Sequence, residues 1–185
     1  MEITDIAAFL RYFGNIRART MRVIDCIPPE RLEWRPAAGA FSLGDLVRHL
    51  GAIERWMFAE NAAGRPSRYP GHGRELADGP AQVRAYIERM HTEAMEIFTA
   101  LGPDDLRRPC TTPGGGLSTW KWLRAMVEHE VHHRGQIYLM LNQLGVPTPP
   151  LYGLTSEEVR ARSEPAGSED ATARAHAGRA EDSTA

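Results

Sequence analysis

Three histidines lie close together between residues 117 and 145: His129, His132 and His133. An α-helix turns by about 100° per residue, so His129 and His133, four residues apart, lie one turn apart on the same face. Apolar residues at three- and four-residue spacings define the inward face of this stretch. His129 and His133 lie on or beside that face, whereas His132 points toward polar neighbours. Two inward imidazoles at this spacing can bind one metal ion together.

A purely structural role is the alternative for these histidines, because most buried polar side chains are simply hydrogen-bonded to a neighbour. That explanation suits a lone histidine better than a pair. Two unpartnered imidazoles are costly to bury, and a shared metal ion offsets the cost. The pairing therefore favours metal ligation by His129 and His133.

The same stretch contains HEVHH, which matches the HExxH motif of zinc proteases. In that class both histidines bind zinc and the glutamate, here Glu130, is the general base. The extended form of the motif requires Gly and His where this chain has Gln136 and Leu139. Glu130 also lies about 100° from His129 around the helix, away from the centre of the apolar face. We therefore do not expect a protease.

Four stretches have the periodicity of amphipathic helices and could position these residues; they cover approximately residues 4–27, 43–63, 80–101 and 118–144. No segment between them shows a convincing strand pattern. The stretch 64–79, rich in Gly, Pro, Arg and Tyr, is predicted to be a loop that could form the wall or lid of a site. Residues 102–117 are predicted to be a second loop. The fold expected is all-α, an antiparallel four-helix bundle.

We expect one domain over residues 1–162, followed by a disordered C-terminal tail over residues 163–185. The tail is dominated by Ser, Ala, Gly, Glu and Arg and has no large apolar residue, so it cannot bury a core. The domain is long enough for a sizeable core.

Composition excludes several kinds of partner. The formal net charge of -2 gives no basic balance that would favour nucleic acid or an anionic membrane. We find no apolar run long enough to span a bilayer and no pattern typical of a signal peptide. The two cysteines, Cys26 and Cys110, have no metal-binding spacing and are expected to be free thiols. We therefore expect a cytoplasmic protein with no nucleic-acid or membrane partner.

Two further histidines could complete a metal site. His49 and His91 lie on the shoulders of the apolar faces of the second and third predicted helices. A hydrogen-bonded structural role would suit either of them. Periodicity alone does not choose between them as the third ligand.

Two motifs of the chain resemble the DinB-like family of helical proteins. They are HEVHHRGQIYLMLNQLGVPTPPLYG, which begins at His129, and SLGDLVRHLGAIERWMF, which begins at Ser42. The resemblance covers about the first 155 residues. It implies a four-helix bundle that binds one divalent metal ion through one histidine of the second helix and an HxxxH pair of the fourth. The implied ligands are His49, His129 and His133, which selects His49 over His91.

Such a site could activate a nucleophile. Three neutral imidazoles leave the charge of a divalent ion unneutralised and a coordination position open. The ion lowers the pKa of bound water toward about 7 and stabilises a bound thiolate. The resemblance implies the thiol reaction, in which zinc or nickel assists transfer of a low-molecular-weight thiol to a small electrophilic substrate. The alternatives are a hydrolase that uses metal-bound water and a non-catalytic bundle that binds metal or a small molecule.

The sequence identifies no catalytic residue beyond the metal ligands. Glu54 and Glu130 could act as acid or base only if they reach the open side of the metal. Gln136 could hydrogen-bond a ligand imidazole or simply pack against its neighbours. The resemblance also makes a homodimer a candidate oligomeric state.

Overall fold

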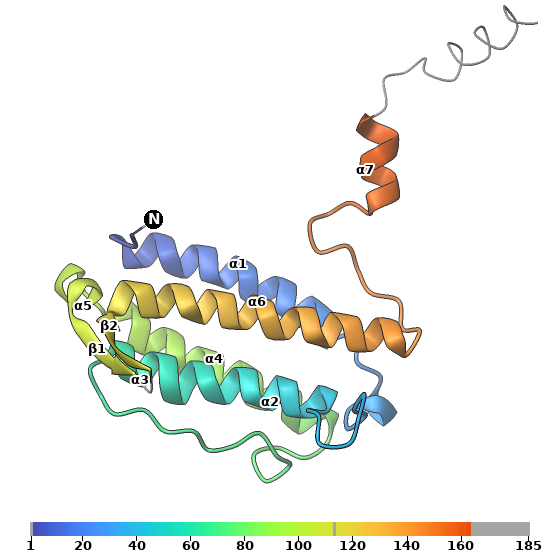
Figure 1. Ribbon diagram of the computed structural model, residues 1–185, viewed down its shortest axis with the longest axis horizontal. Helices are drawn as coiled ribbons and strands as arrows, with labels where there is room; N and C mark the ends of the chain where they lie inside the picture. The colour runs from blue at the N-terminus through green and yellow to red at the C-terminus, as the bar shows by residue number, and fades with distance from the viewer. Residues whose placement is uncertain (1, 113, 164–185) are drawn as a thin grey trace, which may run out of the picture. The chain divides into compact units, whose positions relative to one another are not determined.

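The computed structural model describes residues 2–112 and 114–163, and most of them are helical. Four long helical segments lie side by side around an apolar core (Figure 1). The segments are α1 (Ile6–Ile24), α2 (Leu43–Ile53) continued by η2 (Glu54–Ala59) and α3 (Glu60–Ala62), α4 (Pro80–Thr99), and α6 (Thr119–Gln143). The shorter elements are the 3-10 turn η1 (Pro29–Arg31), the helices α5 (Pro103–Arg107) and α7 (Ser156–Ser163), and the strands β1 (Pro109–Thr112) and β2 (Gly115–Ser118).

The helix directions do not alternate along the chain as they would in the predicted antiparallel bundle. Glu54 contacts His91 and Arg55 contacts Glu93, so α2 with its continuation η2 runs in the same direction as α4. α2 and α6 run in opposite directions, whereas strict alternation would make the second and fourth helices parallel. The segment 63–79 returns along α2 before α4 begins (Figure 1). An extended chain advances about 3.3 Å per residue and a helix about 1.5 Å, so this crossover segment can span the whole helix.

The predicted loop over residues 102–117 is more regular than expected. It contains α5 and an antiparallel hairpin in which Pro109 lies opposite Ser118 and Thr112 lies opposite Gly115. Each strand has only four residues, and β2 contains two glycines. Such short strands carry too few side chains to show an apolar alternation, so the sequence pattern did not predict them.

α2 begins with a capping box. The Ser42 hydroxyl accepts a hydrogen bond from the Asp45 backbone N–H at 3.0 Å, and the Asp45 carboxylate accepts one from the Ser42 N–H at 2.9 Å. Ser118 is the N-cap residue of α6, although its side chain makes no capping hydrogen bond. The helix after Ile53 widens into the π-helical segment η2, which periodicity did not predict. Segments of this kind frequently occur at functional sites.

The chain divides into two compact units, Met1–Pro149 and Pro150–Ala185. The first contains the four long segments, and the second contains α7. A capping box between Thr155 and Glu158 begins α7. The predicted disordered tail lies outside the described residues from residue 164 onward.

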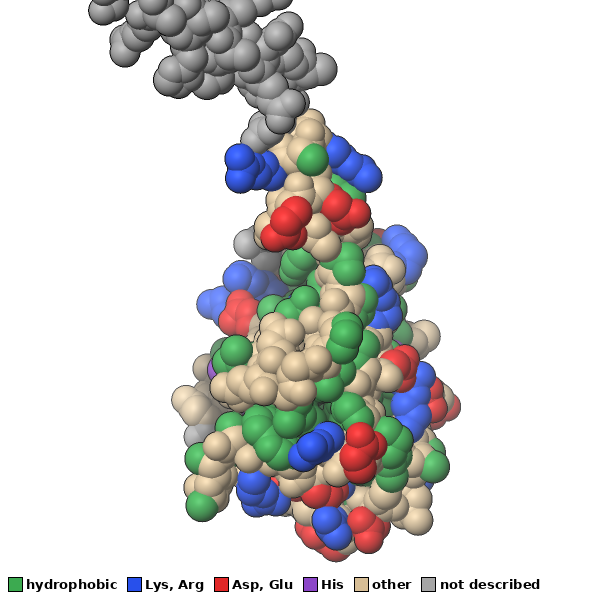
Figure 2. Space-filling view, turned by 90° about the vertical axis from the view of Figure 1, so that its right-hand side faces the viewer, with side chains coloured by type: hydrophobic (Ala, Val, Ile, Leu, Met, Phe, Trp, Pro, Cys, Tyr) green, Lys and Arg blue, Asp and Glu red, His purple; other side chains and the backbone are tan. Residues whose placement is uncertain are grey.

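The surface is mixed in character. On the face shown in Figure 2, Lys, Arg, Asp and Glu side chains lie scattered among hydrophobic ones, and little histidine is visible. Within the described ranges, no helix combines the length and the apolar character needed to cross a membrane.

Candidate metal centre

Three histidines from two antiparallel helices converge in the first unit. His49 lies on α2, and His129 and His133 lie on α6. One ring nitrogen of each lies within 4.8 Å of the corresponding nitrogens of the other two. The Nε2 atoms of His49 and His129 are 3.0 Å apart. A tetrahedral zinc ion with nitrogen ligands at about 2.0–2.1 Å would place those nitrogens about 3.3 Å apart. This group, called the histidine triad below, could therefore hold one divalent ion.

The environment keeps the triad uncharged. Burial, together with repulsion from neighbouring positive groups, lowers the pKa of His49 to about 4 and that of His129 to about 3. Burial also lowers the pKa of His133. A neutral imidazole has one nitrogen lone pair available for a metal ion, whereas a protonated one has none. All three imidazoles could consequently act as donors to one metal ion at neutral pH.

Hydrogen bonds at the outer nitrogens orient two of the three rings. The Gln136 amide oxygen lies 2.7 Å from His133 Nδ1, and an amide oxygen can only accept, so His133 donates from Nδ1. The Tyr69 hydroxyl lies 2.8 Å from His49 Nδ1. A proton on Nδ1 leaves the Nε2 lone pair for a metal, and such outer partners commonly orient metal-binding histidines. Of the two roles considered for Gln136, the hydrogen-bonding role is the one observed.

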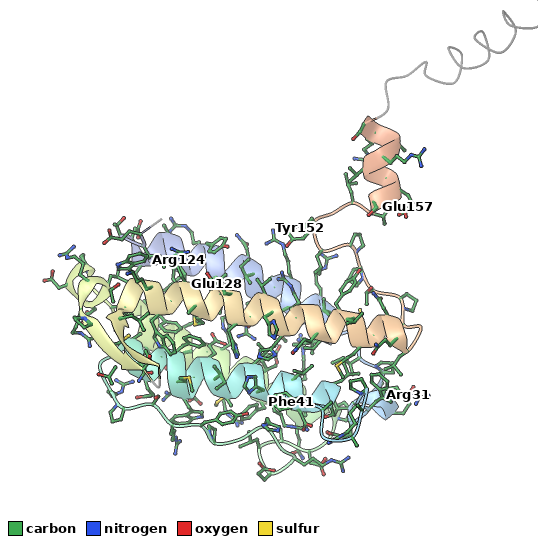
Figure 3. All side chains as sticks on the ribbon, viewed as in Figure 1. Arg31, Phe41, Arg124, Glu128, Tyr152 and Glu157 are labelled. Carbon is green, nitrogen blue, oxygen red and sulfur yellow. The ribbon has the colours of Figure 1, made fainter. Side chains whose placement is uncertain are left out.

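The contacts of Tyr69 and His72 were not predicted from the sequence. Both residues lie on the crossover segment, and the Tyr69 hydroxyl is 2.7 Å from His72 Nδ1. The contact of Tyr69 with His49 agrees with the prediction that residues 64–79 could form a wall of the site. Burial raises the pKa of Tyr69 to about 12, so its hydroxyl keeps its proton at neutral pH. Phe41, labelled in Figure 3, lies in the segment that leads into α2, and its ring centroid is 4.2 Å from that of His72.

The remaining histidines of the four helical segments have other environments. His91 is hydrogen-bonded through Nδ1 to the Glu54 carboxylate at 2.7 Å. His132 is exposed, as its position on the helix predicted. The structure therefore brings His49, and not His91, to the HxxxH pair. Periodicity could not make this choice because both histidines lie at the edge of an apolar face.

A second buried cluster combines residues of these two helical segments with residues of α1 and α4. Arg17 of α1 forms ion pairs with Glu54 and, at 3.2 Å, with Glu130. All three side chains are at most 5% exposed. With His91, these residues are called the charged cluster below. The pairing with Arg17 occupies the carboxylate of Glu130 that a protease of the HExxH class would need as its general base. It likewise engages both carboxylates that the sequence offered as acid or base groups.

Comparison with known proteins agrees with the fold and places the chain in a family. Residues 12–137, more than half of the chain, match the profile of the DinB superfamily, and the chain belongs to this superfamily. A crystal structure of a DinB-like protein from Bacillus cereus is similar, with a TM-score of 0.68 and 18% identity over 80% of this chain and 97% of that one. A DinB-like protein from Bacillus subtilis gives a TM-score of 0.65 and 19% identity over 78% and 97%. No curated protein matched the chain.

Proposed function

We propose that this chain is a metal-dependent enzyme that transfers a low-molecular-weight thiol to a small electrophile. In this proposal the four long helical segments act as a four-helix bundle that binds one divalent ion, zinc or nickel, through His49, His129 and His133. The observation that supports it is the uncharged, all-imidazole donor set of the triad. When bound, a divalent ion keeps its full positive charge among such ligands and favours the thiolate form of a thiol at neutral pH.

The chain's own residues would hold this centre and limit access to it. The Phe58 ring lies 5.7 Å from His129 and 4.4 Å from Trp122, so aromatic side chains cover one flank of the triad. An apolar flank excludes water and strengthens electrostatic interactions within the site. The three histidines themselves are only partly buried, which leaves an approach for a small substrate.

The reacting thiol would come from a separate molecule. Burial raises the pKa of both Cys26 and Cys110. Each thiol also donates a hydrogen bond to a backbone carbonyl, that of Arg22 and that of Leu117 respectively. Both cysteines are thus protonated at neutral pH and are poor nucleophiles.

A turnover assay tests this proposal. The protein loaded with Zn²⁺ or Ni²⁺ is mixed with a model electrophile such as chlorodinitrobenzene, with and without cysteine or glutathione. We expect turnover that requires both metal and thiol, that is lost in His129→Ala and that is retained in His132→Ala. Turnover without thiol would instead support a hydrolase, and metal binding without turnover of any electrophile would support a non-catalytic binding protein.

A further inference from the structure

The Tyr69 hydroxyl connects the triad to a histidine outside it. It lies 2.8 Å from His49 Nδ1 and 2.7 Å from His72 Nδ1. A tyrosine hydroxyl has one proton to donate and two lone pairs to accept with. It uses its proton within this group of three residues only if one imidazole donates to the hydroxyl and the other accepts from it. Which group donates in each of these two hydrogen bonds therefore depends on which ring nitrogen of His49 carries the proton.

Binding of a metal ion by His49 would fix the donor and the acceptor in both hydrogen bonds. If His49 presents the Nε2 lone pair to the triad, its proton must lie on Nδ1 and be donated to Tyr69. Tyr69 then donates to His72 Nδ1, and the proton of neutral His72 must lie on Nε2. The three residues form a hydrogen-bonded arm in which each polar group has a compatible partner.

The arm is anchored to α2 by the residue that precedes His49. Arg48 is fully buried, and its Nε donates to the His72 backbone carbonyl at 2.7 Å. One terminal nitrogen of the same guanidinium donates to the Ala77 carbonyl at 3.1 Å and to the Glu33 carboxylate at 2.9 Å. Two consecutive residues of α2 thus contact the crossover segment: Arg48 fixes its backbone, and His49 meets its side chains.

From this geometry we propose that Tyr69 and His72 are positioning residues that fix the ring orientation and tautomer of His49 for metal binding. This inference rests on the proposed function, because it assigns a role in loading the same site. It makes the crossover segment part of the metal centre. The loss of such an outer partner typically weakens metal binding by about 10- to 100-fold.

The test compares Tyr69→Phe with wild type and with Tyr12→Phe, a matched removal of a hydroxyl from an exposed tyrosine of α1. Affinity for Zn²⁺ is measured by competition with a chromophoric chelator. We expect Tyr69→Phe to bind about 10- to 100-fold more weakly and Tyr12→Phe to bind as wild type does. A changed visible absorption spectrum of the Co²⁺-loaded Tyr69→Phe protein would show altered ligand geometry, which a general loss of stability would not produce.

Variants of His72 provide a second, independent test. His72→Asn keeps an acceptor near the position of Nδ1 and is expected to bind Zn²⁺ more tightly than His72→Ala. In the wild-type protein, nitrogen NMR should find the His49 proton on Nδ1 and the His72 proton on Nε2.

The outcomes separate the two proposals. If wild type binds no Zn²⁺, the metal site itself is wrong and the inference falls with it. If wild type binds Zn²⁺ and Tyr69→Phe binds equally well with an unchanged Co²⁺ spectrum, only the inference is overturned. A His49 proton on Nε2 in the Zn²⁺-loaded protein would also overturn it.

Discussion

The histidine triad and the charged cluster share two helical segments, α2 with its continuation η2 and α6, and differ in how their polar groups are compensated. Adjacent residues of a helix point about 100° apart, so α6 directs His129 toward α2 and Glu130 toward α1. In the charged cluster, the guanidinium of Arg17 lies between two carboxylates. In the triad, three neutral imidazoles face one another.

The charged cluster contains its own counter-charges, whereas the triad has none and could hold a cation. Burying a charge is costly unless an opposite charge compensates it, and the charged cluster contains both signs of charge, although Arg17 Nε, Arg17 Nη1 and Glu130 Oε1 have no hydrogen-bond partner. The triad places several lone pairs around one point, where they repel one another unless a cation or a proton is shared. The comparison therefore predicts that changes in the charged cluster mainly affect folding, and that changes in the triad mainly affect metal binding.

The largest effect is expected from Arg17→Met. The substitution leaves Glu54 and Glu130 buried without their cation, which typically costs about 3–5 kcal/mol. Urea unfolding of the metal-free protein measures the loss, and Arg107→Met is the matched control because its ion pair is exposed. The folded fraction of Arg17→Met should still bind metal. A variant as stable as wild type that has lost its metal would reverse the roles assigned to the two clusters.

Metal addition should stabilise the folded protein through the triad alone. Zn²⁺ at a hundred times its dissociation constant is expected to increase the free energy of unfolding by about 2.7 kcal/mol, because the ion binds the folded state preferentially. Thermal unfolding with Zn²⁺ and with a chelator measures the increase. It should be absent in His129→Ala and retained in His132→Ala, which changes an exposed neighbour. Equal stabilisation of the two variants would show that the ion binds elsewhere.

Acid should destabilise the metal-free protein through the triad. An unfolded histidine titrates near pH 6.5, whereas the folded pKa is about 4 for His49 and about 3 for His129. Between these values the unfolded state binds more protons, so stability is complete above about pH 6.5 and falls as the pH falls through this window. Each histidine can contribute at most about 1.4 kcal/mol per pH unit.

Urea unfolding at several pH values between 7 and about 4.5 measures this slope. In His129→Ala the slope should be smaller, since one of the depressed groups is gone. An unchanged slope in that variant would assign the acid sensitivity to other groups.

The smallest effect is expected from Gln136→Leu. The variant removes the acceptor for His133 Nδ1 and should weaken Zn²⁺ binding by about tenfold, near the lower end for an outer partner, because Gln136 is exposed and water can replace its oxygen. Gln143→Leu at the exposed end of the same helix is the control. Competition with a chromophoric chelator measures the Zn²⁺ affinity of both variants. Equal affinities would mean that water alone orients His133.

The sequence predicted those features that depend on spacing within one helix. His129 and His133 lie four residues apart, so their shared face follows from helix geometry. The choice of His49 over His91 needed the family resemblance, because the contact of His91 with Glu54 joins two different helical segments.

Features that depend on long-range packing were missed. The parallel course of α2 and α4, the widened turn η2 and the contacts of Tyr69 and His72 each arise where distant segments meet. The crossover segment has no periodicity that would mark its inward side chains. Only its length and its Tyr-x-x-His spacing offered a signal, and neither is specific.

Metal content tests the central claim most directly. Elemental analysis of the purified protein, after loading with Zn²⁺ or Ni²⁺ and removal of excess ion, should find about one divalent ion per chain, as expected for a single site. We predict that His49→Ala, His129→Ala and His133→Ala each lose it and that His91→Ala keeps it. A wild-type protein without bound metal, or a loss confined to His91→Ala, would contradict the account and make the triad a set of structural histidines.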